Sequence, residues 1–558
     1  MAVCAPRPEG TSGTQNAVTI DATQQEPISP YVYGLNFPEY IYNYGLNLPE
    51  WDKLGLGFTT ARLGGNRMTA YNWENNASNA GNDYHNQSDG AMGESNEPGW
   101  TDRTFLQAAQ AHGAACLITI PTEGYVAADK GPAGDVNLTP NYLGVRFLKS
   151  YARKPGGHYA YPPDTSDRAV YQDECVVWIE RIAKKDTPVW FALDNEPDTW
   201  AGTHSRICLA KPTYASIIAN NIDFGGAIKE VAPSALVFGP AHYGWQGIRS
   251  FQDASDAHGR FFTDVYLDAM KEAEAKAHHR ILDVYDIHYY PEARGDDVRV
   301  TENKDSAGLY AARIQSPRSL WDPTYVEKSW ITQSNGGKPV RLIADIQERI
   351  QKHCPGTKLS ITEYNFGGNN HISGTIAQAD VLGIFGRYGV FAACNWGMGP
   401  NDRAEIAGFR SFLNYDGKGA HFADQGLKVG GEEPEANSVY AALDSKNPQR
   451  MTVVVINKTA ASRTETVTIK GFVPKSAKAF TIAGADFDHS KSGEASVGSG
   501  EVTLTTPPLS VTTVEIGGDG FALGGGGGAG DGAQLPQDHG ARGPVDAARG
   551  PGRRSVGW

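Results

Sequence analysis

The chain has 558 residues, of which 40% are hydrophobic and 20% charged, and its formal net charge is −13. This length exceeds that of one ordinary domain and suits a large domain with a smaller module. Because the chain is acidic and has no run of about 18 apolar residues, we expect neither nucleic acid nor a membrane as its partner.

Composition divides the chain into five segments. Residues 1–14 have no regular pattern and are expected to be disordered, whereas 15–29 read as one strand with alternating β-branched side chains. Residues 30–429 alternate short apolar strands with helical stretches. Residues 430–517 contain short strands separated by turns, which is typical of a β-sandwich. Residues 518–558 are rich in glycine without apolar periodicity, so we expect a disordered tail.

Eight apolar stretches of the middle segment are predicted strands: 31–36, 59–65, 114–121, 190–197, 236–242, 283–291, 359–365 and 391–397. Helical stretches lie between several of them, at 101–111, 213–231, 259–276 and 340–354. Eight strands interleaved with helices predict an α/β fold, the (β/α)₈ or TIM barrel.

Nearly every predicted strand ends in a polar or aromatic residue: Asn36, Arg62, Glu123, Glu196, His242, Tyr290, Glu363 and Trp396. A barrel builds its active site from the C-terminal ends of its strands and the loops that follow. Ordinary strand-to-loop transitions favour Gly, Asn and Asp, so they explain recurring Glu, His, Arg and Trp poorly. We therefore expect the functional site at this rim.

The scattered cysteines lack the spacing of a structural zinc site. Cys116 and Cys394 lie in apolar segments and are expected to be buried thiols; a disulfide among the other four stays open. The N-terminus lacks a basic start followed by an apolar stretch. Either a signal peptide has been removed, or none exists.

Two glutamates end the fourth and the seventh predicted strands, in Asn195-Glu196-Pro197 and in Glu363-Tyr364. Glycoside hydrolysis needs one carboxylic acid to protonate the leaving oxygen and one carboxylate on the other side of the sugar. The tripeptide alone is a weak signal, but its position and a matching glutamate strengthen it. The sequence thus predicts Glu196 as general acid/base and Glu363 as nucleophile, against the alternative of surface or salt-bridged glutamates.

Four longer strings accompany this pair: Ala61-Arg-Leu-Gly-Gly-Asn, Tyr71-Asn-Trp-Glu-Asn-Asn, Phe191-Ala-Leu-Asp-Asn-Glu-Pro and Ser360-Ile-Thr-Glu-Tyr-Asn. Together they resemble glycoside hydrolase family 44. The resemblance covers residues 15–517 and implies a barrel joined to a β-sandwich that includes the N-terminal strand. It also implies endo-cleavage of β-1,4-glucans, including carboxymethylcellulose and xyloglucan, with xylan or mannan as side substrates. We expect a secreted monomer that needs no catalytic cofactor.

Two alternatives remain at this point. A barrel glycosidase could act mainly on xylan or mannan, because the sequence does not show the room for each sugar's hydroxymethyl group. A non-catalytic carbohydrate-binding protein could use the same cleft, although the presence of both glutamates speaks against it. Retention of configuration requires the two carboxyl groups to lie about 5–5.5 Å apart, against about 6.5–9.5 Å for inversion. It also requires the higher pKa at Glu196.

Supporting roles follow from strand positions. Asn195 is placed to hydrogen-bond the 2-hydroxyl of the sugar. Arg62, at the end of strand two, is expected to keep Glu363 ionised, and its alternative is an ion pair with Asp194.

Two residues of strand six share one face. Tyr290 is the expected hydrogen-bond partner of Glu363, with His288 second. His242, after strand five, is expected to bind substrate or to be a packed histidine at the rim.

Sugar rings stack on flat aromatic side chains, so an endo-acting cleft should contain Trp and Tyr. Trp396 is the predicted platform at the cleavage site. Trp73, Trp321 and Trp330 lie in long loops and are further candidates, although each could anchor its loop instead.

Oxygen-rich loops around Glu74 and Asp173 suggest a hard-cation site, and the resemblance allows a structural Ca²⁺. Solvated loop carboxylates are the alternative, because no twelve-residue calcium loop is present. No phosphate-binding loop, Ser-His-Asp order or dinucleotide fingerprint competes for the site.

Overall fold

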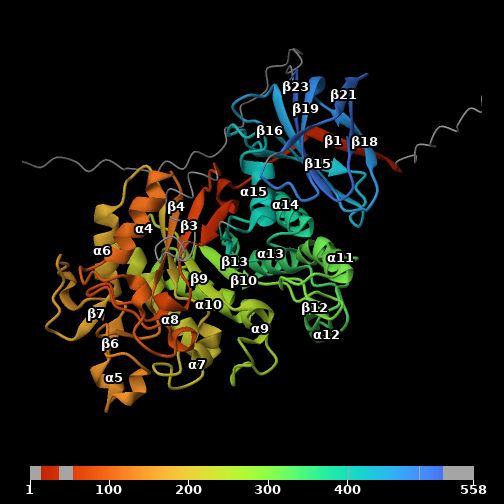
Figure 1. The fold of residues 1–558 in the computed structure, drawn as a ribbon. Helices are drawn as coiled ribbons and strands as arrows, with labels where there is room; N and C mark the ends of the chain where they lie inside the picture. Colours follow the sequence, from red (N-terminus) through yellow and green to blue (C-terminus); the bar gives the residue numbers. More distant parts are fainter. Residues whose placement is uncertain (1–13, 37–54, 400, 489, 520–558) are drawn as a thin grey trace, which may run out of the picture. The chain divides into compact units, whose positions relative to one another are not determined.

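The computed structural model of the protein describes residues 14–36, 55–399, 401–488 and 490–519. Within these ranges the chain forms a barrel and a β-sandwich (Figure 1). Most of the residues expected to be disordered, 1–14 and 518–558, lie outside these ranges, whereas residues 14, 518 and 519 belong to strands. None of the described helices is both long and apolar enough to cross a membrane.

Eight parallel strands close into a barrel, as the sequence predicts. In chain order they are β2 (Gly34–Asn36), β3 (Thr60–Leu63), β4 (Ala115–Ile120), β8 (Val189–Leu193), β9 (Val237–His242), β10 (Val284–Tyr289), β13 (Lys358–Tyr364) and β14 (Ala392–Asn395). Each overlaps one of the eight predicted stretches, and β14 pairs with β2 to close the ring. Strands β4 and β8 are buried on both faces, which explains their continuous apolar sequences.

Helices cover the outside of the barrel (Figure 1). The longer ones are α4 (Trp100–Ala111), α6 (Gln172–Ile182), α8 (Tyr214–Val231), α10 (Phe262–Ala277), α13 (Leu342–His353), α14 (Ile372–Arg387) and α15 (Arg403–Leu413). Helix α8 begins at a capping box in which the Thr213 and Ser216 side chains each accept from the other's backbone N–H. Each helix runs back toward the start of the next strand, so the loops that follow the strands gather at one rim.

The β-sandwich contains the N-terminal strand, as expected. Strand β1 (Thr14–Pro27) pairs with two strands far away in the sequence, β15 and β18. The other strands are β15 (Gln425–Gly430), β16 (Asn437–Leu443), β17 (Arg450–Asn457), β18 (Arg463–Lys470), β19 (Val473–Ala483), β20 (Lys491–Gly493), β21 (Ala495–Gly498), β22 (Glu501–Thr506) and β23 (Ser510–Asp519). The sheet folds over so that β17 and β19 meet β22 across a core rich in valine and isoleucine. Because β15 belongs to this sheet, the sandwich begins before residue 430.

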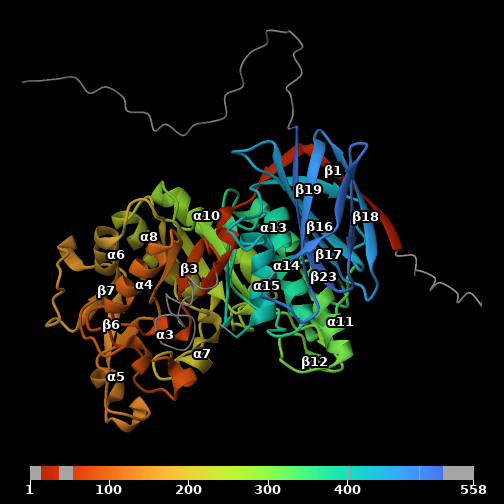
Figure 2. The ribbon, with the colours of Figure 1, turned by 45° about the horizontal axis from the view of Figure 1, so that its top comes forward.

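Helices α14 and α15 pack against the β-sandwich (Figure 2). A buried ion pair joins Lys458 of the sandwich to Asp380 of α14 at 2.7 Å, and Tyr440 donates its hydroxyl proton to Asp380 at 2.6 Å. Removing one partner of such a pair would leave a buried charge alone, at a cost of about 3–5 kcal/mol. These contacts fix the sandwich to the helical shell of the barrel.

The five cysteines in the described ranges are free and buried: Cys116, Cys175, Cys208, Cys354 and Cys394. The two thiols predicted to be buried are among them, and the sixth cysteine, Cys4, lies outside these ranges.

Candidate active site

The chain makes a strained turn where β8 ends. Asp194 (φ 64°) and Glu196 (φ 44°) both have left-handed backbone conformations, which cost non-glycine residues about 1–3 kcal/mol each. The buried Asp194 carboxylate holds the turn by accepting hydrogen bonds from the Thr69 hydroxyl at 2.7 Å and from the Asn195 backbone N–H at 2.8 Å. The strain is therefore offset by contacts that direct Glu196 toward the mouth of the barrel.

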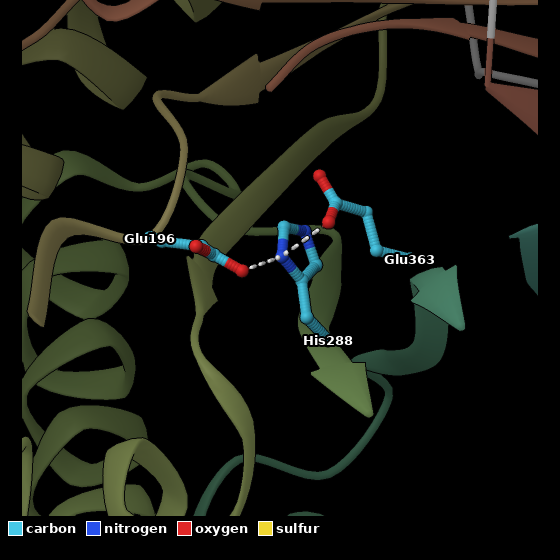
Figure 3. Close-up of side chains that lie close together, drawn as sticks. All are labelled: Glu196, His288 and Glu363. Carbon is cyan, nitrogen blue, oxygen red and sulfur yellow. Dashed lines mark hydrogen bonds and ion pairs between the residues drawn. The ribbon is translucent and has the colours of Figure 1, made fainter. Parts of the chain in front are cut away.

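Glu196 and Glu363 approach each other with His288 between them (Figure 3). One carboxylate oxygen from each glutamate and Nδ1 of His288 all lie within 4.8 Å of one another. Nδ1 is 2.8 Å from Oε1 of Glu196 and 3.4 Å from Oε2 of Glu363. So close an approach of the facing oxygens fits the carboxyl separation of retaining glycosidases, about 5–5.5 Å, better than that of inverting ones, about 6.5–9.5 Å.

The two glutamates have different electrostatic surroundings. Burial raises the pKa of Glu363, but the Arg62 guanidinium at 2.7 Å from its Oε1 and the Tyr290 hydroxyl at 2.9 Å from its Oε2 oppose that rise. Burial also raises the pKa of Glu196, to well above its ordinary value, and the charges of Glu363 and Asp198 add to the effect. These surroundings favour the proton on Glu196 and the negative charge on Glu363.

His288 is fully buried, with its Nδ1 toward Glu196. Burial and then the Arg62 charge lower the pKa of His288 to well below its ordinary value, so the ring is neutral. A neutral imidazole can hydrogen-bond Glu196 without adding a charge that would ionise it. The same three groups form the one described cluster with metal-ligand spacing, and their hydrogen bonds already engage the ligand atoms.

Arg62 lies in the centre of the hydrogen-bond network around Glu363. Besides binding Glu363, it donates to Oδ1 of Asn36 at 3.0 Å and to Oδ1 of Asn195 at 2.8 Å. Its ion-pair partner is thus Glu363 and not Asp194, the alternative that the sequence left open. Residue 64 must be glycine because a Cβ there would come within 2.4 Å of the guanidinium carbon.

Trp396 follows β14 at the same rim, partly exposed. Its ring lies over Gly65, where an added Cβ would come within 2.6 Å of the indole. Gly65 also has a φ of 81°, which other residues rarely adopt. The Gly-Gly step after β3 thus leaves room for both the guanidinium and the indole, and Trp396 keeps the position expected of a sugar platform.

Three predictions about substrate-binding residues are wrong, and the first two concern Trp73 and His242. Trp73 is 1% exposed and stacks on Trp178 with ring centroids 5.9 Å apart, so its faces are unavailable to a sugar and it anchors its loop. His242 is fully buried, and its Nε2 lies 2.8 Å from the Tyr285 hydroxyl. Burial lowers the pKa of His242 to about 3, so it is a neutral packed histidine, the alternative named for it.

The other two loop tryptophans differ from each other. Trp330, at the start of α12 (Trp330–Ser334), is 42% exposed. Trp321 instead stacks on Tyr388, with centroids 5.7 Å apart. Because α14 starts at the rim and ends just before Tyr388, Trp321 lies toward the opposite end of the barrel from the glutamates. The prediction that Trp321 lines the catalytic cleft is therefore wrong.

Sequence patterns missed several residues of the site. Asn36 holds Arg62, as described above. Asn66 accepts a hydrogen bond from Asn195 Nδ2 at 3.1 Å and donates one to Asp83 at 2.7 Å. Tyr243, directly after β9, is 41% exposed, and its backbone N–H donates to Asp198 at 2.8 Å. Position at a strand end was the available signal for Asn36 and Tyr243, and for Asn66 the signal was its place at the end of the string Ala61-Arg-Leu-Gly-Gly-Asn.

The residues predicted to bind a cation are also partly engaged in other contacts. The Asp173 carboxylate accepts from the Lys154 backbone N–H at 2.9 Å and from the Tyr159 hydroxyl at 2.9 Å. Glu74, by contrast, is 3% exposed and has a buried Oε1 without a hydrogen-bond partner. Burial and neighbouring carboxylates raise the pKa of Glu74 to about 8; those neighbours are Asp167, Glu174 and Asp164.

Replacing Tyr290 by phenylalanine tests the charge balance at Glu363. The hydroxyl lowers the pKa of Glu363, so its loss should raise that pKa. A hydrogen bond to a charged group contributes about 1.5 kcal/mol, which corresponds to about one pH unit. The acidic limb of the kcat/KM–pH profile should therefore move to higher pH by about that amount while the alkaline limb stays.

Tyr289→Phe is the matched control, because the hydroxyl of this neighbouring buried tyrosine has no hydrogen-bond partner. Equal profiles for the two variants would contradict the assignment of Tyr290.

The chain resembles known proteins over most of its length. The model of glycoside hydrolase family 44 matches residues 77–293. Endoglucanase A of Paenibacillus lautus is 34% identical over 549 residues, which is 93% of this chain and 75% of that protein. β-Mannanase/endoglucanase A of Caldicellulosiruptor saccharolyticus is 38% identical over 464 residues, covering 77% of this chain, and the chain spans 33% of that relative.

A solved structure agrees with these sequences. The family 44 xyloglucanase of Paenibacillus polymyxa, determined with xyloglucan, superposes with a TM-score of 0.81 at 31% identity, over 90% of this chain and 100% of that one. The identity across nearly the whole chain, the same fold and the glutamates at the ends of β8 and β13 agree: the chain belongs to glycoside hydrolase family 44.

Proposed function

We propose that this protein is a retaining endo-β-1,4-glucanase that cleaves β-1,4-glucans such as carboxymethylcellulose and xyloglucan. The observation that carries the proposal is the glutamate pair, with oxygens within 4.8 Å of each other and a higher pKa at Glu196 than its ordinary value. One protonated and one ionised carboxyl at this spacing are what double displacement needs.

In the proposed reaction, ionised Glu363 attacks the anomeric carbon while Glu196 gives its proton to the glycosidic oxygen. The glycosyl–Glu363 ester forms as that C–O bond breaks, and the negative charge on Glu363 is lost. The pKa of Glu196 then falls, so Glu196 accepts a proton from water, which hydrolyses the ester and restores Glu363. Arg62 and Tyr290 stabilise Glu363 as nucleophile and as leaving group.

Substrate choice is supported by the names of relatives and by aromatic side chains near the rim. The similar proteins are named endoglucanase, xyloglucanase and β-mannanase/endoglucanase. Trp396 is the proposed platform at the cleavage site, and the exposed Trp330 and Tyr243 are proposed to contact sugars further along the chain. Mannan and xylan are proposed only as side substrates. The relative with mannanase in its name is about three times longer than the segment aligned with this chain, so its mannanase activity can belong to another part of that protein.

Initial products from cellohexaose, xyloglucan, xylan and mannan test this function. We expect internal cleavage of cellohexaose and xyloglucan, seen as mid-length products before glucose or cellobiose accumulates, with slower release from xylan and mannan. Faster cleavage of xylan or mannan than of either glucan would reassign the enzyme to the alternative activity.

We further propose that the protein acts outside the cell, because its polymeric substrates do not enter cells. We also propose that it acts as a monomer. Fractionation of the producing culture and the elution volume in size-exclusion chromatography check these two points; enzyme retained in the cells or eluting as a dimer would contradict them.

A structural Ca²⁺ ion is proposed to bind at Glu74 together with neighbouring carboxylates, and not at Asp173. Glu74 offers a buried oxygen without a hydrogen-bond partner, and additional negative charge surrounds it. Calcium favours such clustered oxygens. An ion there would hold the loop after β3 to the segment before α6, without taking part in the reaction.

Calcium should therefore raise the melting temperature, and chelation should lower it. Ion binding must displace the proton of Glu74, whose pKa lies at about 8, so the stabilisation should grow as the pH rises toward 8. Glu74→Gln should abolish this response, whereas Asp173→Asn should lower the melting temperature equally with and without calcium. A calcium response that survives Glu74→Gln would place the ion elsewhere.

A further inference from the structure

A crevice between the barrel helices and the β-sandwich has the properties of a second binding site. It has a volume of about 460 Å³, within the range of about 300–1,000 Å³ usual for small-ligand pockets. Its walls come from β1, from the end of α14 and from β15 and β16. Because α14 ends at the barrel face opposite the glutamates, the crevice is separate from the catalytic rim.

An aromatic pair forms one side of this crevice. Trp321 and Tyr388 stack with an interplanar angle of 23° and are both only partly buried. A stacked pair holds both rings in one orientation, so little side-chain entropy is lost when a ligand packs against them. Flat, fixed, amphipathic rings of this kind suit the apolar face of a sugar.

Polar groups at the crevice are fixed as well. Arg387 binds the Glu432 carboxylate at 3.0 Å, and its guanidinium lies 4.5 Å from the centre of the Tyr440 ring. The Glu432 carboxylate also accepts the Val439 backbone N–H at 2.7 Å. Planar, pre-oriented donors and acceptors beside aromatic rings recognise hydroxyl groups at low cost.

The charged side chains that line the crevice cancel each other. Glu26 and Glu432 are negative, whereas Arg387 and Lys428 are positive. A strongly anionic or cationic ligand would gain no net attraction here, while a neutral ligand with hydroxyl groups loses nothing. Together with the aromatic pair, this balance favours an uncharged glycan.

We propose that this crevice is an auxiliary glucan-binding site that holds a remote part of the polymer on which the active site works. The identity of the glycan rests on the proposed function. A polymer long enough to pass around the barrel can occupy both sites, and the second contact then becomes intramolecular, which raises overall affinity. A short oligosaccharide cannot bridge the sites, so the effect of the crevice must depend on chain length.

Native electrophoresis through gels that contain xyloglucan or hydroxyethylcellulose tests the proposal. Full-length Glu363→Gln is used as the parent, so that the polymer is not hydrolysed during the run. Adding Trp321→Ala, or separately Tyr388→Ala, should weaken retardation by the neutral polymers about 5–10-fold, as expected for loss of one stacking platform. Carboxymethylcellulose gels should show a smaller difference.

Tyr151→Ala is the matched control, since Tyr151 is an exposed tyrosine stacked on Tyr171 at 6.0 Å and lines no part of the crevice. Unchanged melting temperatures establish that each variant is folded. In the wild-type background, Trp321→Ala should raise KM for xyloglucan but leave kcat/KM for cellotetraose within twofold.

If both crevice variants migrate like the Tyr151→Ala control, the auxiliary site is overturned. Absence of hydrolysis by the wild-type protein would instead count against the proposed function. The gel result would still show whether the crevice binds glucan, because it does not depend on hydrolysis.

Discussion

Replacing Glu363 by glutamine should lower kcat on cellohexaose by about 10⁴-fold or more, because the amide cannot form the glycosyl ester. KM should change little, since the amide is isosteric and the cleft remains intact. The rate of reducing-end formation measures the loss. Glu123→Gln is the matched control: this glutamate lies in the loop that follows β4 at the same rim, and its replacement should preserve activity within a few-fold.

Azide can replace the missing nucleophile and so tests whether Glu363 has that role. In Glu363→Ala the removed side chain leaves room for azide to attack the anomeric carbon of an activated aryl β-cellobioside directly. The product should be the α-glycosyl azide, because a single displacement inverts the configuration. Formation of the β-azide by this variant would show that Glu363 is not the nucleophile.

Glu196→Gln should produce a loss that depends on the leaving group. Cellohexaose needs a proton on its departing oxygen, so kcat should fall by about 10³-fold or more. A dinitrophenyl β-cellobioside needs no proton, so its first step should remain fast and the glycosyl–enzyme should accumulate, which appears as a burst of dinitrophenol. The alkaline limb of the pH profile should disappear, because that limb reports deprotonation of Glu196.

Azide also tests the acid/base role of Glu196. In Glu196→Ala it should attack the glycosyl–enzyme without needing a general base, accelerate turnover and yield the β-glycosyl azide. Equal losses on both substrates, without a burst, would remove Glu196 from the acid/base role and favour a purely structural one.

The barrel was predictable because its signals are local. Most strands are apolar runs, and most of the predicted strands end in a residue whose type is unusual for a simple turn, such as Arg62 or Glu363. The glutamate pair was predictable for the same reason, since both lie at strand ends that a closed barrel must bring to one rim. The N-terminal strand β1 was placed in the sandwich through the family resemblance.

Burial depth was not predictable for side chains in loops. Trp73 and Trp330 both follow strands in long loops, yet one is 1% and the other 42% exposed. The difference arises from Trp178 on α6, which stacks on Trp73 across more than 100 residues of sequence. Trp321 was misplaced because the loop that contains it extends to Tyr388 at the other end of the barrel. The direction in which a long loop runs cannot be predicted from its sequence.

The hydrogen-bond network around the glutamates could not be predicted from the sequence either. Asn36 and Asn66 reach Arg62 and Asn195 through contacts of 3.0 and 3.1 Å between distant segments. Asparagine is common in loops for local reasons, so its type alone does not indicate such a role.

Proton NMR of the first products of cellohexaose hydrolysis tests the central claim most directly. Two carboxylates whose facing oxygens lie within 4.8 Å of each other predict that the β-anomer appears first and that the α-anomer grows only at the rate of mutarotation. Initial release of the α-anomer would contradict double displacement by Glu196 and Glu363.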